Sequence, residues 1–166
     1  IGNGCVFVGT NNESPRDPGK IGDRGVVMCL DEKTGELKWQ LVIPKLGAGK
    51  VSDWEYIGIC SSAAIEGDKV YVVTNRCEVV CLDINGLADG NDGPFKDEAA
   101  YVRPKGLKDE LNPKLDADIL WMYDMRDELG VFPHNVTSSS PVIVGDNVYV
   151  ATSNGVDWSH TNIPSP

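Results

Sequence analysis

The 166-residue sequence predicts an all-β protein built from repeated antiparallel sheets. Three observations carry this prediction: short apolar runs of strand length, turn signals between them, and a segment that occurs more than once. The composition agrees, because 18 Gly and 10 Pro make the chain rich in turns, and 41% hydrophobic residues suffice for a core.

The first clear element is a hairpin centred on a tight turn. The apolar run from Val26 to Leu30 has the length of a strand. Asp31 can accept hydrogen bonds from backbone N–H groups two residues on, and Gly35 can adopt a positive φ, so a turn is expected between them. Apolar and polar residues then alternate from Leu37 to Leu41, which is the period of a half-buried strand and places Trp39 on its apolar side.

Residues 60–76 and 138–154 are two copies of one segment. CSSAAIEGDKVYVVTNR aligns without gaps with SSSPVIVGDNVYVATSN, and nine of the 17 positions are identical. Each copy predicts a hairpin, because Gly-Asp pairs at 67–68 and 145–146 are two-residue turn signals between β-rich runs. We therefore expect equivalent hairpins, with Tyr71 and Tyr149 on the same face. A weaker copy, residues 3–11, opens the chain.

The hairpin turn also resembles a known repeat. Asp31, Thr34, Gly35 and Trp39 match the signature of the quinoprotein (PQQ-type) β-propeller repeat, Ala-x-Asp-x-x-Thr-Gly-x-x-x-Trp, with Cys29 where Ala is usual. The resemblance implies antiparallel four-stranded blades of a β-propeller, in which the tryptophan docks one blade on the next. A propeller closes with roughly 4–8 blades, whereas this chain supplies about nine strands. We expect an incomplete segment of about two to three blades, partnered by the remaining blades of a longer chain or by other copies of this chain.

The expected strands divide the chain into three parts. Blade one spans 1–44 and lacks its first strand, blade two spans 57–125, and blade three spans 138–166 and is incomplete. In blade two, Trp121 follows the turn residue Gly86 by 35 residues, whereas Trp39 follows Gly35 by four. Blade two therefore carries an inserted loop, 87–118. We expect this loop to project from the sheet, to be dispensable, and to have its two ends close together.

The connectors suggest a cofactor site. Connectors between antiparallel strands alternate between two faces, so those at 12–24, 45–56, 125–137 and 153–166 gather on one face. In quinoprotein dehydrogenases such loops approach the quinone and its calcium, and the stretch NGVDW at 154–158 partly resembles their Gly-Asn-Pro-x-x-Trp segment. The resemblance implies PQQ and calcium as cofactors, with cofactor contacts from Asn154, Asp157, Trp158 and Arg24.

A separate metal site is suggested by the start of the inserted loop. The stretch DINGLADGNDG at 83–93 is dense in glycine and side-chain oxygens, which suit Ca²⁺ when they are closely spaced on one loop. This hypothesis names Asp89, Asn91 and Asp97 as metal ligands. The spacing of an EF-hand is not met, and an ordered loop of Asx turns without metal is the alternative.

Charge and composition exclude several classes of partner. The chain has 15 Lys and Arg against 25 Asp and Glu, a net charge of −10, and an acidic surface repels phosphate backbones. Nucleic acid is therefore not expected as a partner. No apolar run approaches the roughly 18 residues of a membrane span. The five cysteines include neither a C-x-x-C-H haem site nor a C-x-x-C metal pair, so we expect free thiols.

Two functions remain open at this point, both implied by the resemblance. One is a PQQ- and calcium-dependent oxidoreductase acting on a small-molecule substrate, an alcohol or a sugar; no catalytic residue can be named for it from this sequence. The other is a non-catalytic propeller scaffold for protein–protein interaction or envelope assembly. In either case the resemblance implies a protein that is periplasmic or otherwise exported.

Overall fold

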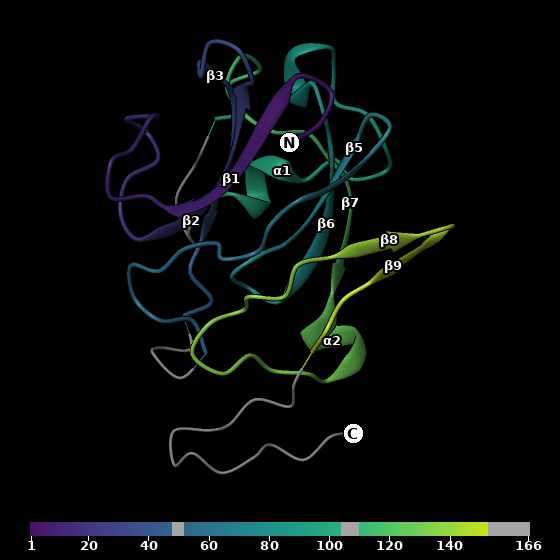
Figure 1. Cartoon of the computed structure of the whole chain (residues 1–166). Coiled ribbons are helices and arrows are strands. Elements are labelled where there is room, and N and C mark those ends of the chain that lie inside the picture. Colours follow the sequence, from purple (N-terminus) through teal and green to yellow (C-terminus); the bar gives the residue numbers. More distant parts are fainter. Residues whose placement is uncertain (48–51, 104–109, 153–166) are drawn as a thin grey trace.

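Nine strands in three antiparallel sheets dominate the part of the chain that the computed structural model describes, residues 1–47, 52–103 and 110–152. The sheets have three, four and two strands and follow one another in chain order. Figure 1 shows them with only short helices between them. The predicted antiparallel, predominantly β architecture is confirmed.

The first sheet contains the hairpin that the sequence predicts. Asp31 Oδ1 accepts hydrogen bonds from the backbone N–H groups of Thr34, at 2.8 Å, and Lys33, at 2.9 Å. Gly35 completes the turn with a φ of +71°. The two hydrogen bonds lower the pKa of Asp31, because they favour its charged form. The strands of this sheet are β1 (Cys5–Asn11), β2 (Arg24–Asp31) and β3 (Leu37–Pro44).

The second sheet repeats the first around its tryptophan. Trp121 lies opposite Cys81, as Trp39 lies opposite Cys29, and in both sheets the register shifts by one residue directly after the cysteine. Every residue of the central strand β6 is buried. The strands of this sheet are β4 (Ala64–Glu66), β5 (Lys69–Val73), β6 (Glu78–Asp83) and β7 (Ile119–Asp124).

The third sheet is a hairpin of β8 (Val142–Val144) and β9 (Asn147–Tyr149). Each of its residue pairs lies 78 positions after a pair in the β4–β5 hairpin; the pair Val142–Tyr149, for example, corresponds to Ala64–Tyr71. The turn glycines of the two hairpins have φ values of +58° and +57°. The two sequence copies therefore share one register and one turn geometry, as predicted.

Trp39 connects the first sheet to the second. Its side chain is 1% exposed, and its Nε1 donates a hydrogen bond to the carbonyl oxygen of Ile84, just beyond β6, at 2.7 Å. A Cβ atom on Gly86 would come within 2.9 Å of the Trp39 ring, so only glycine allows this approach. The side chain thus holds the two sheets together.

Two apolar clusters fill the spaces between the sheets. The larger one joins the first and second sheets and includes Val27, Trp39, Leu41, Val72 and Leu82. The smaller one joins the second sheet to helix α2 (Met125–Leu129) and to the third sheet. Each sheet is therefore packed against the next one along the chain.

The inserted loop is part of the core, and the expectation that it projects from the sheet is wrong. Tyr101, Val102 and Ala117 belong to the larger apolar cluster. The loop also covers the open edge of β3, because the backbone of Gln40 accepts a hydrogen bond from Ala117 and donates one to Leu115. Exposed strand edges favour unwanted pairing, which explains why a covering segment packs there. The loop contains two short helices, η1 (Gly86–Ala88) and α1 (Glu98–Tyr101).

The two ends of the inserted loop do lie together, as predicted. Leu87 N–H donates to the carbonyl oxygen of Asp116 at 3.0 Å, and Asp83 N–H donates to that of Asp118 at 3.0 Å. A buried ion pair between Lys20 and Asp116 then ties the loop to the connector that precedes β2.

The first strands of the second and third sheets, β4 and β8, are only three residues long. Cys77 lies in the turn between β5 and β6, with a φ of +62°. All five cysteines are free thiols, as expected. Within the described ranges, the helices are all too short to cross a membrane.

Candidate functional site

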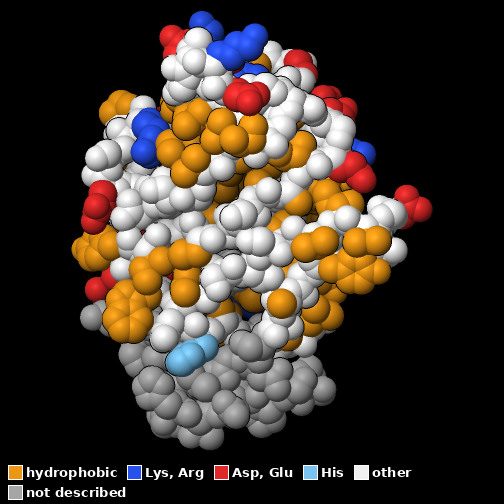
Figure 2. Space-filling view, viewed as in Figure 1, with side chains coloured by type: hydrophobic (Ala, Val, Ile, Leu, Met, Phe, Trp, Pro, Cys, Tyr) orange, Lys and Arg blue, Asp and Glu red, His pale blue; other side chains and the backbone are white. Residues whose placement is uncertain are grey.

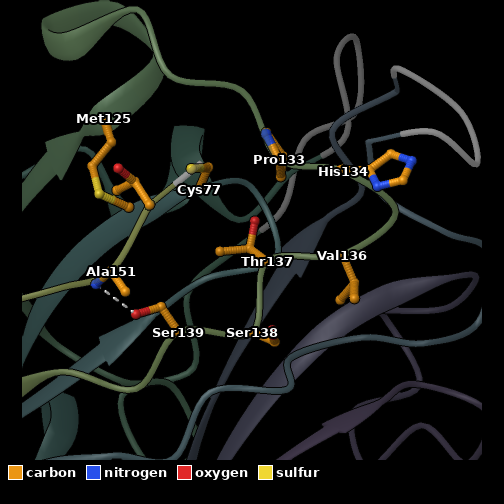
Figure 3. Close-up of a pocket in the computed structure, with 10 residues that line it drawn as sticks. Cys77, Met125, Pro133, His134, Val136, Thr137, Ser138, Ser139 and Ala151 are labelled. Atoms are coloured by element: carbon orange, nitrogen blue, oxygen red, sulfur yellow. Dashed lines mark hydrogen bonds between the residues drawn. The ribbon is translucent and has the colours of Figure 1, made fainter. Parts of the chain in front are cut away.

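A cavity of about 400 Å³ lies beside helix α2, where the second sheet meets the third. Figure 3 shows its lining, which comes from the β5–β6 turn, the start of α2, the connector at 133–139 and the residues just after β9. Of the connectors expected to gather on one face, the one at 125–137 contributes to this lining within the described residues. The lining includes Cys77, Met125, His134, Thr137, Ser139 and Ala151.

Cys77 is held in the cavity by an unusual backbone conformation. Its N–H donates to the carbonyl oxygen of Thr74, and its carbonyl oxygen accepts from Met125 N–H at 3.3 Å. A positive φ at a residue with a side chain costs roughly 1–2 kcal/mol, so the neighbouring contacts must stabilise it. Burial raises the pKa of the Cys77 thiol, and a hydrogen bond with Thr137 offsets this only in part. The thiol is therefore protonated at neutral pH and is not an activated nucleophile.

The cavity lining is chemically neutral. Figure 3 shows the His134 ring on the far side of the cavity from Met125 and Cys77. In the described portion of the lining there is no Asp, Glu, Lys or Arg. Hydroxyl groups supply its polar character; Ser139 Oγ, for example, accepts a hydrogen bond from Ala151 N–H at 3.0 Å. Such a lining can receive a small neutral molecule, and the imidazole of His134 is a candidate general base in its described portion.

The residues expected to contact a cofactor are only partly described. Asn154, Asp157 and Trp158 lie outside the described residues, although Ala151 and Thr152 at the cavity directly precede them. Arg24 is 3% exposed and does not line the cavity. Its Nη1 donates to the carbonyl oxygen of Val102 at 2.8 Å and its Nε to that of Ile21 at 3.0 Å, so its guanidinium joins the connector to the inserted loop.

The residues expected to bind calcium are exposed and have separate partners. Asp89 Oδ2 accepts a hydrogen bond from Asn85 Nδ2 at 2.9 Å, and Asn91 Oδ1 accepts one from Lys96 Nζ at 2.7 Å. Asp97 precedes α1, and its side chain makes no capping hydrogen bond there. Within residues 1–47, 52–103 and 110–152, no three His, Cys, Asp or Glu side chains gather closely enough to hold a metal ion.

Two buried carboxylates beneath this loop were not predicted from the sequence. Glu98 is 1% exposed and Asp118 is fully buried. Burial raises the pKa of Asp118 to about 6, and the negative charges of Glu98, Asp83 and Asp92 add to the effect. The sequence gives little signal of this, because an acidic residue in a polar loop is usually solvated.

A further buried carboxylate, Glu78, lies at the start of β6, and both of its oxygens have partners. Its Oε2 accepts hydrogen bonds from Tyr101 Oη at 2.6 Å and from Thr74 Oγ1 at 2.9 Å. Its Oε1 is paired with Arg76 Nε at 3.1 Å and lies 3.5 Å from Arg126 Nη2. Burial raises the pKa of Glu78 despite these partners. The cluster joins the second sheet, the inserted loop and α2.

Comparison with known proteins gives no assignment. No protein-family model matches the chain, and no curated protein is significantly similar to it.

Proposed function

We propose that the three sheets are successive blades of a PQQ-type β-propeller and that the chain acts as a rigid scaffold within a larger ring. The observation that carries the proposal is an aromatic pair that recurs at one register position. Phe7 packs on Trp39 with ring centroids 5.9 Å apart, and Tyr71 packs on Trp121 at 6.0 Å. A repeated pair of this kind is expected where identical blades stack by means of one tryptophan.

The third sheet supports the same proposal. Tyr149 occupies the register position of Tyr71, yet it is 57% exposed, as are Val142 at 57% and Val144 at 59%. Figure 2 shows apolar side chains over the β8–β9 hairpin. In a propeller this face would be covered by the neighbouring blade, because successive blades pack face to face. We propose that further blades of a longer chain, or other copies of this chain, provide that cover.

The chemistry of the described residues favours a scaffold over an enzyme. PQQ is a polycarboxylate and requires cationic partners, but the described lining of the cavity contains no Lys or Arg. Arg24, the expected cationic contact, is occupied with backbone carbonyls away from the cavity. The described residues therefore offer the cofactor no cationic contact at the cavity, and we derive no catalytic step through it. Export to the periplasm is supported only by the resemblance of the repeat.

Electron microscopy of the assembled particle tests the scaffold proposal. The full chain, in the assembly that it forms in solution, should give a ring of similar blades around a central channel. A particle without a channel, or an open filament, would contradict it.

A quinone-dependent oxidoreductase of alcohols or sugars is the second candidate. The observation in its favour is that Ala151 and Thr152 line the cavity and lead directly into Asn154, Asp157 and Trp158. The full chain mixed with PQQ and CaCl₂ should then show the absorbance band of a bound quinone after gel filtration. Asn154→Ala should abolish the band, whereas Asn112→Ala, in the inserted loop, should keep it. Absence of the band in the unmodified chain rules this candidate out.

A further inference from the structure

Glu98 and Asp118 form a pair of buried carboxylates with one unpartnered oxygen each. Glu98 is 1% exposed and Asp118 is fully buried. Glu98 Oε1 and Asp118 Oδ1 are both enclosed, and neither has a hydrogen-bond partner among the described residues. Burying a carboxylate oxygen without a donor or a counter-charge is strongly unfavourable. A cation, a hydrogen-bond donor from outside the described residues or a bound proton would stabilise these oxygens.

The loop above the two carboxylates holds one oxygen of each. Asn91 Nδ2 donates to Glu98 Oε2 at 2.9 Å, and the N–H of the next residue, Asp92, donates to Asp118 Oδ2 at 2.7 Å. Two consecutive residues thus hold one oxygen of each carboxylate and leave the other oxygen open. Gly93 comes next with a φ of +67°, where a Cβ atom would lie only 2.6 Å from the carbonyl oxygen of Leu120. The loop is therefore pressed against β7.

The charged neighbours of Asp118 among the described residues are acidic, namely Glu98, Asp83 and Asp92. The ion pairs found within the described ranges include neither Glu98 nor Asp118. Lys96, the lysine of this loop, directs its ammonium group to the carbonyl oxygens of Asn91 and Asp92 and to Asn91 Oδ1.

We propose that Glu98 Oε1 and Asp118 Oδ1 are ligands of a hard divalent cation, Ca²⁺, bound beneath the 91–93 loop. Oxygen-only donors on a glycine-containing loop suit calcium, which accepts water and backbone carbonyl oxygens as its remaining ligands. Zinc or copper would favour His or Cys donors, and neither residue type occurs between 83 and 118. With two side-chain ligands the affinity is modest, with a Kd on the order of 10⁻⁴–10⁻³ M.

This site differs from the one that the sequence suggested. The exposed residues Asp89 and Asp97 have no part in it, and Asn91 acts as a positioning residue through its hydrogen bond to Glu98. Because Glu98 begins helix α1 and Asp118 immediately precedes β7, a bound cation would fasten the inserted loop to the second sheet.

Calorimetric titration of the full, chelator-treated chain with CaCl₂ tests the proposal. We expect one Ca²⁺ per chain and a rise in Tm on addition of CaCl₂, because a ligand that binds only the folded state stabilises it. Glu98→Gln and Asp118→Asn should each weaken binding by at least about tenfold, since even changes outside the ligand set often do so. Asp97→Asn removes the same charge from an exposed neighbour and should leave binding unchanged.

The Tm values of Glu98→Gln and Asp118→Asn should also differ from that of the unmodified chain, in opposite directions with and without Ca²⁺. In chelator they should raise Tm, because one of two repelling buried charges is gone; in CaCl₂ they should lie below the unmodified chain. Absence of both binding heat and Tm shift in the unmodified chain would overturn the proposal. Unchanged binding in both Glu98→Gln and Asp118→Asn, or loss of binding in Asp97→Asn, would overturn it as well.

Discussion

Trp39 and Trp121 occupy the same register position, yet their surroundings differ. Trp39 is 1% exposed and hydrogen-bonded to Ile84, because the second sheet and the inserted loop cover it. Trp121 is only partly buried, since a two-stranded sheet lies beyond it. The energetic role of the repeated tryptophan should therefore depend on the size of the sheet that packs against it.

Replacing Trp39 with Ala should reduce the free energy of unfolding by roughly 3–5 kcal/mol, the usual cost of deleting a buried aromatic side chain. Trp121→Ala is the matched control and should cost clearly less. Urea titration followed by circular dichroism measures both. A loss below about 1 kcal/mol for Trp39→Ala would mean that this side chain does not hold the two sheets together.

Glu78 makes the stability depend on pH. Burial raises its pKa above the ordinary value of 4.5, so the folded state retains the proton to higher pH than the unfolded state does. Its contribution is therefore fully present below about pH 4.5 and is lost as the pH rises through the folded-state pKa. The unfolding free energy of the unmodified chain relative to Glu78→Gln should fall over this range.

Urea titrations at a series of pH values measure this difference. Asp127→Asn, on the exposed side of α2, should leave the pH profile unchanged. If the unfolding free energy of the unmodified chain rises relative to that of Glu78→Gln as the pH increases, the assignment is contradicted.

At the scale of single residues, features could be predicted where they leave a local signal in the sequence and could not be predicted where they do not. The turn at Asp31 and Gly35 could be predicted, because Asx turns and positive φ restrict residue choice. The burial of Glu98 and Asp118 could not, since it depends on segments 20 residues apart that pack together. The aromatic pairs were also missed; Phe7 and Tyr71 stand at equivalent strand positions, and aligning the weaker first copy with residues 69–75 would have found them.

At the scale of elements, the inserted loop is the main difference from expectation. Its bounds could be predicted from the lengthened distance between Gly86 and Trp121. Its packing could not, because Tyr101 and Val102 belong to one apolar run of only four residues and Ala117 stands between two aspartates, so that no strand or helix period is visible. Only the open edge of β3, a property of the folded sheet, explains where the loop lies.

Replacing residues 87–118 with the short turn sequence of the first sheet, Glu-Lys-Thr-Gly, should therefore abolish cooperative unfolding. The exchange would uncover Trp39 and the β3 edge and would remove Tyr101 from Glu78. Thermal unfolding followed by circular dichroism measures the result. Replacing only residues 12–22 with the same short turn leaves the larger apolar cluster intact and serves as the comparison. Native-like melting after the 87–118 exchange would show that the loop is peripheral after all.

At the scale of the whole molecule, the antiparallel, repeated architecture could be predicted because the two hairpin copies agree at nine positions. The order of the sheets follows from chain order alone. The apolar outer face of the β8–β9 hairpin is exposed in the described structure. The segment that packs on this face therefore could not be predicted in the same way.

We expect this face to drive association. Val142, Val144 and Tyr149 are each more than half exposed and lie on one face of the hairpin, so burying them against a partner is favourable. Sedimentation velocity over a range of concentrations should show association of the full chain. Val142→Thr combined with Val144→Thr should weaken it, while Ile21→Thr, at an exposed site distant in sequence, should not. A monomer at all concentrations would contradict the expectation.

The hydrogen bonds between Gln40 and the segment 115–117 bear on the order in which the protein forms during translation. Asp116, which bridges to Gln40, is added 76 residues after it (116 − 40). At roughly 5–20 residues per second, the edge of β3 waits about 4–15 s for the segment that covers it. The first sheet is thus synthesised early but completed late. Nascent chains stalled after residue 118 has emerged from the ribosome should protect the region of Trp39 from protease, whereas chains stalled before residue 100 has emerged should leave it open to cleavage.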